Sequence, residues 1–130
     1  MIGRQLLLFS IAGTVGFLTD VGVLYAALGA GAGFYSGRVL SFLVAAFVTW
    51  VFNRRFTFPD RARVERWWFE CLRYFQAMSL GAAVNYLCYA GVVHTMSMDW
   101  WTPMLGVAAG SAAGLGINFL LARQWVFKST

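Results

Sequence analysis

Asp20 is an acidic residue inside the first long apolar run of the sequence, which extends from residue 5 to residue 28. A charge inside a membrane-spanning helix costs at least about 2.5–3.5 kcal/mol on insertion scales, so it needs an ionic partner or a water-filled cavity. Two interpretations stay open: Asp20 forms a structural pair with Arg38, or it lines a polar path for a substrate or a coupling ion. Asn85 lies at the matching depth of a later apolar run, which favours the path.

Arginines follow two further apolar runs, Arg54 and Arg55 after one and Arg123 after the other. The simpler interpretation is that they are topology signals at the membrane surface. Guanidinium groups also bind phosphate oxygens through paired hydrogen bonds, which suggests that they hold a lipid phosphate. Aromatic rings that suit stacking on a sugar lie beside them in the sequence: Trp50, Phe56, Trp125 and Phe127.

The apolar runs that end in these arginines repeat one another. Small or polar residues recur at every fourth position, and adding 69 to each position of the first set gives the second: Gly37, Ser41, Ala45 and Thr49, then Gly106, Gly110, Gly114 and Asn118. The two preceding runs correspond at an offset of 65, which relates Gly16 and Asp20 to Gly81 and Asn85. A spacing of four keeps residues on one helical face, and small side chains let helices approach closely in lipid. The glycines are therefore expected to serve packing.

The composition requires a bilayer. Of the 130 residues, 60% are hydrophobic and 12% are charged, and the mean hydropathy is +0.67, far from the values of soluble domains. All ten basic residues except Arg38 lie near the amino end, between residues 54 and 73, or near the carboxyl end. This distribution follows the positive-inside rule, predicts that both termini are cytoplasmic, and leaves no basic surface for nucleic acid.

The elements that must position these residues are four transmembrane helices, at about residues 5–28, 35–53, 72–93 and 102–122. The sequence thus predicts a single-domain, all-α membrane protein made of two tandem hairpins: repeat one (1–58), a linker (59–70) and repeat two (71–130). Each hairpin crosses twice, so the repeats are parallel and related by an axis along the membrane normal. The linker, after Pro59, has the pattern of a short interfacial amphipathic helix, although a plain basic linker is equally consistent.

Residues for catalysis or metal binding are missing from the pattern. Cys71 and Cys88 are separated by about 25 Å on one predicted helix, too far for a disulfide. His94 is the one histidine, and it is predicted on the side of the membrane opposite the arginines. We expect no catalytic residues, no metal, no cofactor and no enzymatic activity.

With these residues in hand, the chain resembles the GtrA-like family of small four-helix membrane proteins. The resemblance rests on FSIAGTVGFLTDVGVLY (residues 9–25), FNRRFTF (52–58) and NFLLARQWVF (118–127). The family's repeated ending is an asparagine, a few apolar residues, an arginine and spaced aromatics, which Asn118, Arg123 and Trp125 match. The first half departs from it, because Thr49 stands where the second half has Asn118, and Asn53 offers an amide one turn later.

The resemblance implies flipping of a polyprenyl-phosphate-linked sugar across the bacterial inner membrane for cell-surface polysaccharide synthesis. It assigns the phosphate to Arg54, Arg55 and Arg123. The polar candidates for the sugar path are Asp20, Asn85, Asn118, Asn53, Tyr25, Tyr89 and Trp125. Four short helices enclose such a path poorly, so a homodimer among membrane lipids is expected.

Two alternatives remain. A small multidrug-type, proton-coupled exporter would use an embedded acid such as Asp20, but three inner-leaflet arginines would repel cationic drugs. A membrane adaptor would instead anchor a glycosyltransferase, with Trp67 and Trp68 of the linker on the contact surface.

Overall fold

The computed structural model describes residues 2–60, 66–97, 99 and 101–127. Four long helices account for most of them: α1 (Ile2–Gly29), α2 (Phe34–Phe52), α3 (Trp67–Thr95) and α4 (Thr102–Leu121). Two short π-helical segments, η1 (Asn53–Thr57) and η2 (Ala122–Val126), continue α2 and α4. Within the described ranges the protein is all-helical and contains no strand.

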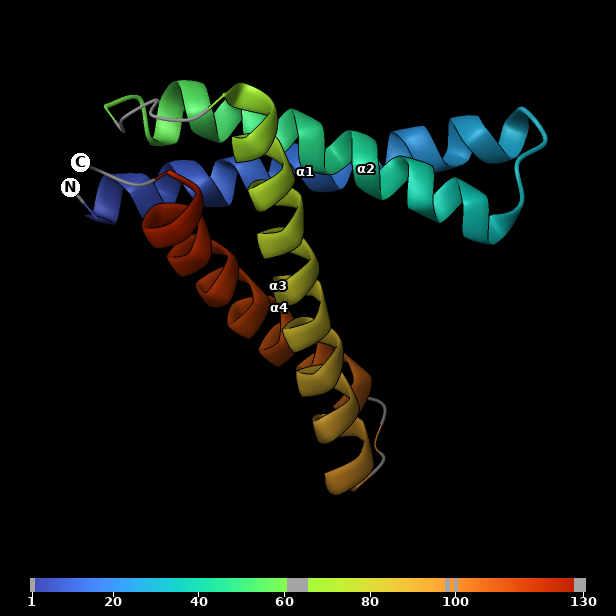
Figure 1. The fold of residues 1–130 in the computed structure, drawn as a ribbon. Helices are drawn as coiled ribbons and strands as arrows, with labels where there is room; N and C mark the ends of the chain where they lie inside the picture. The colour runs from blue at the N-terminus through green and yellow to red at the C-terminus, as the bar shows by residue number, and fades with distance from the viewer. Residues whose placement is uncertain (1, 61–65, 98, 100, 128–130) are drawn as a thin grey trace.

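The helices form two antiparallel hairpins, α1 with α2 and α3 with α4 (Figure 1). The hairpins meet at the end where both termini lie and diverge from there, so that the outer ends are far apart (Figure 1). We call the shared end the foot; it comprises the start of α1, the start of α3, η1 and η2. The turn between α1 and α2 uses Gly31 at a φ of 97°, a left-handed conformation that side chains disfavour.

Small residues let the two helices of each hairpin approach closely, and the contacts correspond between hairpins. The Cα of Gly16 packs against Thr49 in the first hairpin, and the Cα of Gly81 packs against Asn118 in the second. Similarly, Gly37 packs against Leu24 and Gly106 against Tyr89. The predicted packing role of Gly37 and Gly106 is therefore confirmed.

The two π-helical segments occupy positions 69 residues apart, 53–57 and 122–126. In each, a phenylalanine amide reaches back five residues: Phe58 N–H donates to the Asn53 carbonyl at 2.8 Å, and Phe127 N–H donates to the Ala122 carbonyl at 2.7 Å. The extra residue per turn ends the helix and directs both phenylalanines into the core. Phe58 and Phe127 stack there, with ring centroids 5.0 Å apart and an interplanar angle of 17°.

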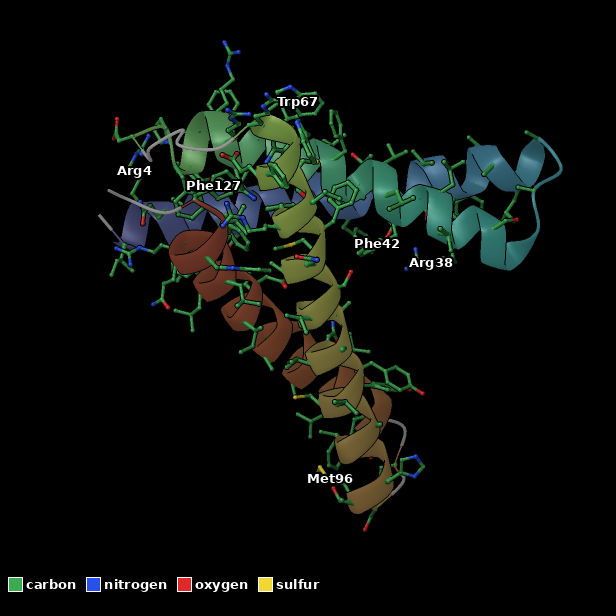
Figure 2. The ribbon with its side chains drawn as sticks, in the orientation of Figure 1. Arg4, Arg38, Phe42, Trp67, Met96 and Phe127 are labelled. Carbon is green, nitrogen blue, oxygen red and sulfur yellow. The ribbon has the colours of Figure 1, made fainter. Side chains whose placement is uncertain are left out.

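The core is concentrated in the foot. Its larger buried members come from all four helices and the two π-helical segments: Phe9, Trp50, Phe58, Tyr74, Phe119 and Phe127. Figure 2 shows Phe127 in the foot and Met96 at the far end of α3. Away from the foot many large apolar side chains are exposed, Phe17 and Leu87 among them, as expected for surfaces that face lipid.

Three helical stretches are long and apolar enough to cross a membrane: Ile2–Gly29, Ser36–Thr57 and Leu105–Val126. Helix α3 is not among them, and it carries Glu70, Arg73, Gln76 and Asn85.

The start of α3 differs from the sequence prediction, which placed the third helix at about Leu72. Helix α3 begins at Trp67, so Trp67, Trp68 and Glu70 belong to its first turn. Glu70 is buried and accepts a hydrogen bond from the Trp50 indole, a contact that fixes this turn against α2. The rest of the expected linker helix falls largely on residues 61–65, outside the described residues.

We predict that Gly110→Ala destabilises the protein by about 1–3 kcal/mol, the typical cost of overpacking. The added methyl group would lie 2.5 Å from the backbone carbonyl oxygen of Asn85, which cannot move without shifting α3. The measurement is reversible unfolding in detergent micelles. Gly116→Ala is the control on the same helix, because its Cβ would enter open space. Equal stability of the two variants would contradict the packing described above.

Candidate functional site

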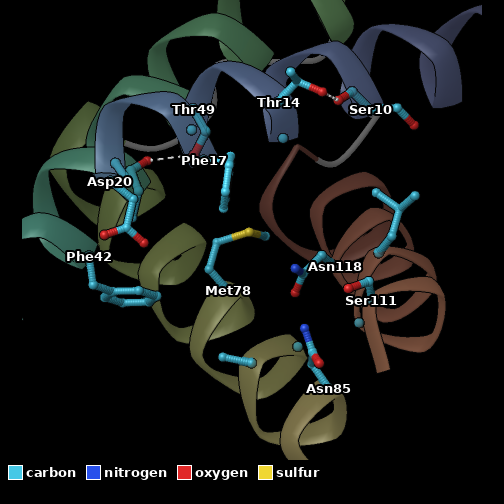
Figure 3. Close-up of a pocket in the computed structure, with 18 residues that line it drawn as sticks. Ser10, Thr14, Phe17, Asp20, Phe42, Thr49, Met78, Asn85, Ser111 and Asn118 are labelled. Carbon is cyan, nitrogen blue, oxygen red and sulfur yellow. Dashed lines mark hydrogen bonds between the residues drawn. The ribbon is translucent and has the colours of Figure 1, made fainter. Parts of the chain in front are cut away.

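A cleft of about 670 Å³ lies between the two hairpins (Figure 3). All four helices line it, and all of its lining residues except Ser10 and Thr14 form pairs related by the offsets of 65 and 69. The pairs are Gly13 with Met78, Gly16 with Gly81, Phe17 with Ala82, Asp20 with Asn85, Phe42 with Ser111, Ala45 with Gly114, Ala46 with Leu115, and Thr49 with Asn118. Polar side chains thus line a space in an otherwise apolar helical assembly.

Asp20 lines this cleft and is also paired. Its carboxylate Oδ1 lies 2.6 Å from Nη1 of Arg38, and 21% of its side chain stays exposed. The two sequence interpretations of Asp20 therefore coexist in one geometry, a structural pair that borders the cleft. Asn85 occupies the corresponding place in the second hairpin, where Val107 stands in the position of Arg38.

Asn118 borders the cleft and packs against Gly81 of α3, where the missing side chain makes room for the Asn118 amide. Its Oδ1 is buried and has no hydrogen-bond donor among the described residues. Buried side-chain oxygens are usually bonded. Asn118 is therefore a polar group of the cleft with unused hydrogen-bonding capacity.

Asn53 lies away from the cleft, in the foot, where only 1% of it is exposed. Its side chain belongs to a chain of hydrogen bonds: Thr57 donates to Asn53 Oδ1 (2.7 Å), Asn53 Nδ2 donates to the Tyr74 hydroxyl (2.9 Å), and Tyr74 donates to Thr49 Oγ1 (2.9 Å). These bonds occupy the Asn53 amide. The structure thus gives Asn53 a packing position and does not bring it together with Asp20, Asn85 and Asn118.

The arginines at the ends of α2 and α4 make contacts that the sequence interpretation missed. Arg54 Nε lies 3.5 Å from Glu70 Oε1, and its guanidinium lies over the Trp50 ring at 5.4 Å. Arg123 Nε donates to Gln5 Oε1 at 3.0 Å. The offset of 65 that relates Asp20 to Asn85 also relates Gln5 to Glu70, so this signal was present in the sequence.

Three other predicted residues lie outside the cleft lining. Tyr25 is 71% exposed near the outer end of α1, and Tyr89 packs on Gly106. Trp125 borders a second, mostly apolar groove of about 540 Å³, together with residues of α3. Arg55 is exposed, with its guanidinium 5.9 Å from the Phe56 ring.

Metal chemistry finds no site in the described part of the chain, where no group of three or more histidine, cysteine, aspartate or glutamate side chains comes together. Both cysteines, Cys71 and Cys88, are free.

We predict that Tyr74→Phe lowers the free energy of unfolding by about 1–3 kcal/mol, because it leaves the buried Asn53 amide without its acceptor. Tyr86→Phe, at an exposed position of the same helix, should change it little. Chemical denaturation in micelles measures both. A loss shared equally by the two variants would argue against the buried network.

The family model described as "GtrA/DPMS, transmembrane domain" matches residues 8–129. The matched range includes the cleft, both arginine contacts from Arg54 and Arg123, and both π-helical segments. No curated protein sequence matches the chain. The match confirms the resemblance to GtrA-like proteins, and the three apolar stretches fit a chain that crosses the membrane several times. The chain therefore belongs to the GtrA/DPMS transmembrane-domain family and is a multi-pass membrane protein of polysaccharide or glycolipid metabolism.

Proposed function

We propose that this protein flips a polyprenyl-phosphate-linked sugar across the bacterial cytoplasmic membrane, as a transporter without enzymatic activity. The observation that carries the proposal is the cleft between the hairpins. Sugar hydroxyls need hydrogen-bonding partners inside the membrane, and the cleft offers several: Ser10, Thr14, Asp20, Thr49, Asn85, Ser111 and Asn118. Its open sides let a prenyl tail remain in lipid while the sugar is inside.

The topology that goes with this function has four crossings. Helix α3 contains 29 residues and is about 44 Å long at the helical rise, which is sufficient to span a bilayer. Two of its polar residues have protein surroundings, since Glu70 bonds to Trp50 and Asn85 lines the cleft. The chain is then two tandem parallel repeats joined by a basic linker, with an axis along the membrane normal that passes near the Phe58–Phe127 stack.

The foot is assigned to the cytoplasmic side, because arginines gather there and the positive-inside rule applies. Both termini lie at this end (Figure 1). In this orientation Arg54, Arg55 and Arg123 lie at the inner leaflet, where a lipid phosphate would be bound. A homodimer would close the sides of the cleft, since two diverging hairpins leave them open.

The two competing functions are weaker on specific grounds. A proton-coupled exporter needs an acid that exchanges protons with the transport path, whereas Asp20 is held by the Arg38 guanidinium. An adaptor for a glycosyltransferase would not need a polar cleft between its hairpins.

The test is translocation of a fluorescent polyprenyl-phosphate sugar in proteoliposomes. We expect transport by the wild-type protein and at least a tenfold loss when Arg54→Ala and Arg123→Ala are combined. Transport that survives the double substitution would remove the arginines from phosphate binding. Drug-coupled proton flux that disappears in Asp20→Asn would instead favour the exporter.

We predict that Gly13→Phe slows translocation at least tenfold without loss of folding. Gly13 lines the cleft, and a Cβ added to it would have no atom within 4 Å, so a phenyl ring would enter the cleft without a backbone clash. Gly22→Phe is the matched control on the same helix, because Gly22 is equally open but lies outside the cleft. Full transport by Gly13→Phe would mean that the sugar does not use this cleft.

A further inference from the structure

We propose that the lipid phosphate binds at one arginine contact only, the contact of Arg123 with Gln5, and that the sugar enters the cleft between α1 and α4. This inference rests on the proposed function and deepens it, because it selects one of two repeat-related positions. The ligand chemistry is a phosphate ester attached to a lipid.

The two arginine contacts are geometrically equivalent. Arg54 at the end of α2 reaches Glu70 on α3, and Arg123 at the end of α4 reaches Gln5 on α1, each through Nε. The arginines are 69 residues apart, and their partners are 65 residues apart. Each contact therefore joins the two hairpins in the foot, one on each side of the axis that relates them.

The charge of the two contacts differs. Glu70 is a carboxylate, it is buried, and it lies 3.5 Å from Arg54, so it compensates the guanidinium and would repel a phosphate. The Trp50 ring also lies against Arg54, at 5.4 Å from its Cζ. Gln5 is a neutral amide that accepts one hydrogen bond from Arg123 Nε. The positive charge of Arg123 is thus not compensated by its partner, and the end of its guanidinium fork suits phosphate oxygens.

The cleft is also asymmetric, and its polar side is the side of Arg123. Ser10 and Thr14 on α1 are the two lining residues whose counterparts, Phe75 and Ser79, line the apolar groove instead. Their hydroxyls donate to carbonyls of their own helix, Leu6 and Ser10 respectively, which leaves oxygen lone pairs for sugar hydroxyls.

Across from them, α4 contributes Ser111 and Asn118, whereas Phe42 of α2 lies on the opposite side (Figure 3). Asn118 Oδ1 is the buried oxygen that has no donor among the described residues. Ser10 is five residues from Gln5, about 7.5 Å along α1 at the helical rise, which is a distance suited to a sugar ring attached to a phosphate at Arg123.

Reciprocal exchange of the two partner residues tests this assignment. Gln5→Glu gives Arg123 the carboxylate partner that Arg54 has, and it keeps an oxygen that accepts from Nε. Glu70→Gln gives Arg54 a neutral partner and keeps an oxygen that accepts from the Trp50 indole. Both substitutions preserve hydrogen bonding, so folding is expected to survive, and thermal unfolding in micelles verifies this.

The readout is binding of phosphatidic acid, a lipid phosphate monoester, to the purified protein by native mass spectrometry, with phosphatidylcholine as the neutral reference lipid. Gln5→Glu is expected to weaken phosphatidic acid binding at least tenfold, and Glu70→Gln is expected to leave it unchanged or tighter. Equal loss in the two variants, or no loss in Gln5→Glu, would overturn the assignment. Binding of inorganic phosphate as tight as that of the lipid would also overturn it, because the ligand would then be a soluble anion.

This binding measurement is independent of transport. If wild-type protein fails to translocate the glycolipid but Gln5→Glu alone loses phosphatidic acid, the phosphate site stands and the flipping function fails. If translocation is normal and both variants bind phosphatidic acid equally, the function stands and the site at Arg123 fails.

Discussion

The stacking of Phe58 on Phe127 is the interaction on which the arrangement of the hairpins depends. Each ring follows a π-helical segment, and Phe9 and Tyr74 pack edge-on against Phe58 and Phe127 with ring centroids 6.5 and 6.1 Å apart. Because apolar surface gives helices no reason to associate inside lipid, shape and hydrogen bonds must hold the hairpins together. The foot supplies both, and the hairpins are then able to diverge from it and leave a cleft between them.

The two halves share a backbone plan but differ in chemistry. In the first, Thr49, Asn53 and Tyr74 form a buried polar network, whereas Ala122 and Phe9 stand at the positions that correspond to Asn53 and Tyr74. That network ties α2 to α3, which stiffens the side of the foot that holds the compensated Arg54–Glu70 pair. The other side keeps the Arg123–Gln5 contact and the more polar part of the cleft. A pseudosymmetric scaffold thus supports one direction of approach for an asymmetric lipid.

The sequence offsets predicted which residues correspond, and the structure places the π-helical segments and most of the cleft lining at those offsets. The pattern did not show partners that depend on tertiary packing. Asn53 looked like a path residue because it stands beside Arg54, but a π turn and Tyr74 draw it into the core. Glu70 was assigned to a surface linker because its neighbours are charged, yet burial against Trp50 makes it the start of α3. For Asp20, the sequence left pairing and cleft lining as alternatives, since only the divergence of the hairpins allows both.

The most direct measurement is an experimental structure in lipid nanodiscs with a polyprenyl-phosphate sugar present. We expect phosphate density within hydrogen-bonding distance of the Arg123 guanidinium, about 2.7–3.2 Å, with the sugar between Asp20 and Asn118 and the tail leaving between α1 and α4. Lipid density confined to the outer faces of the helices, with the hairpins packed together and no cleft between them, would contradict the proposed function.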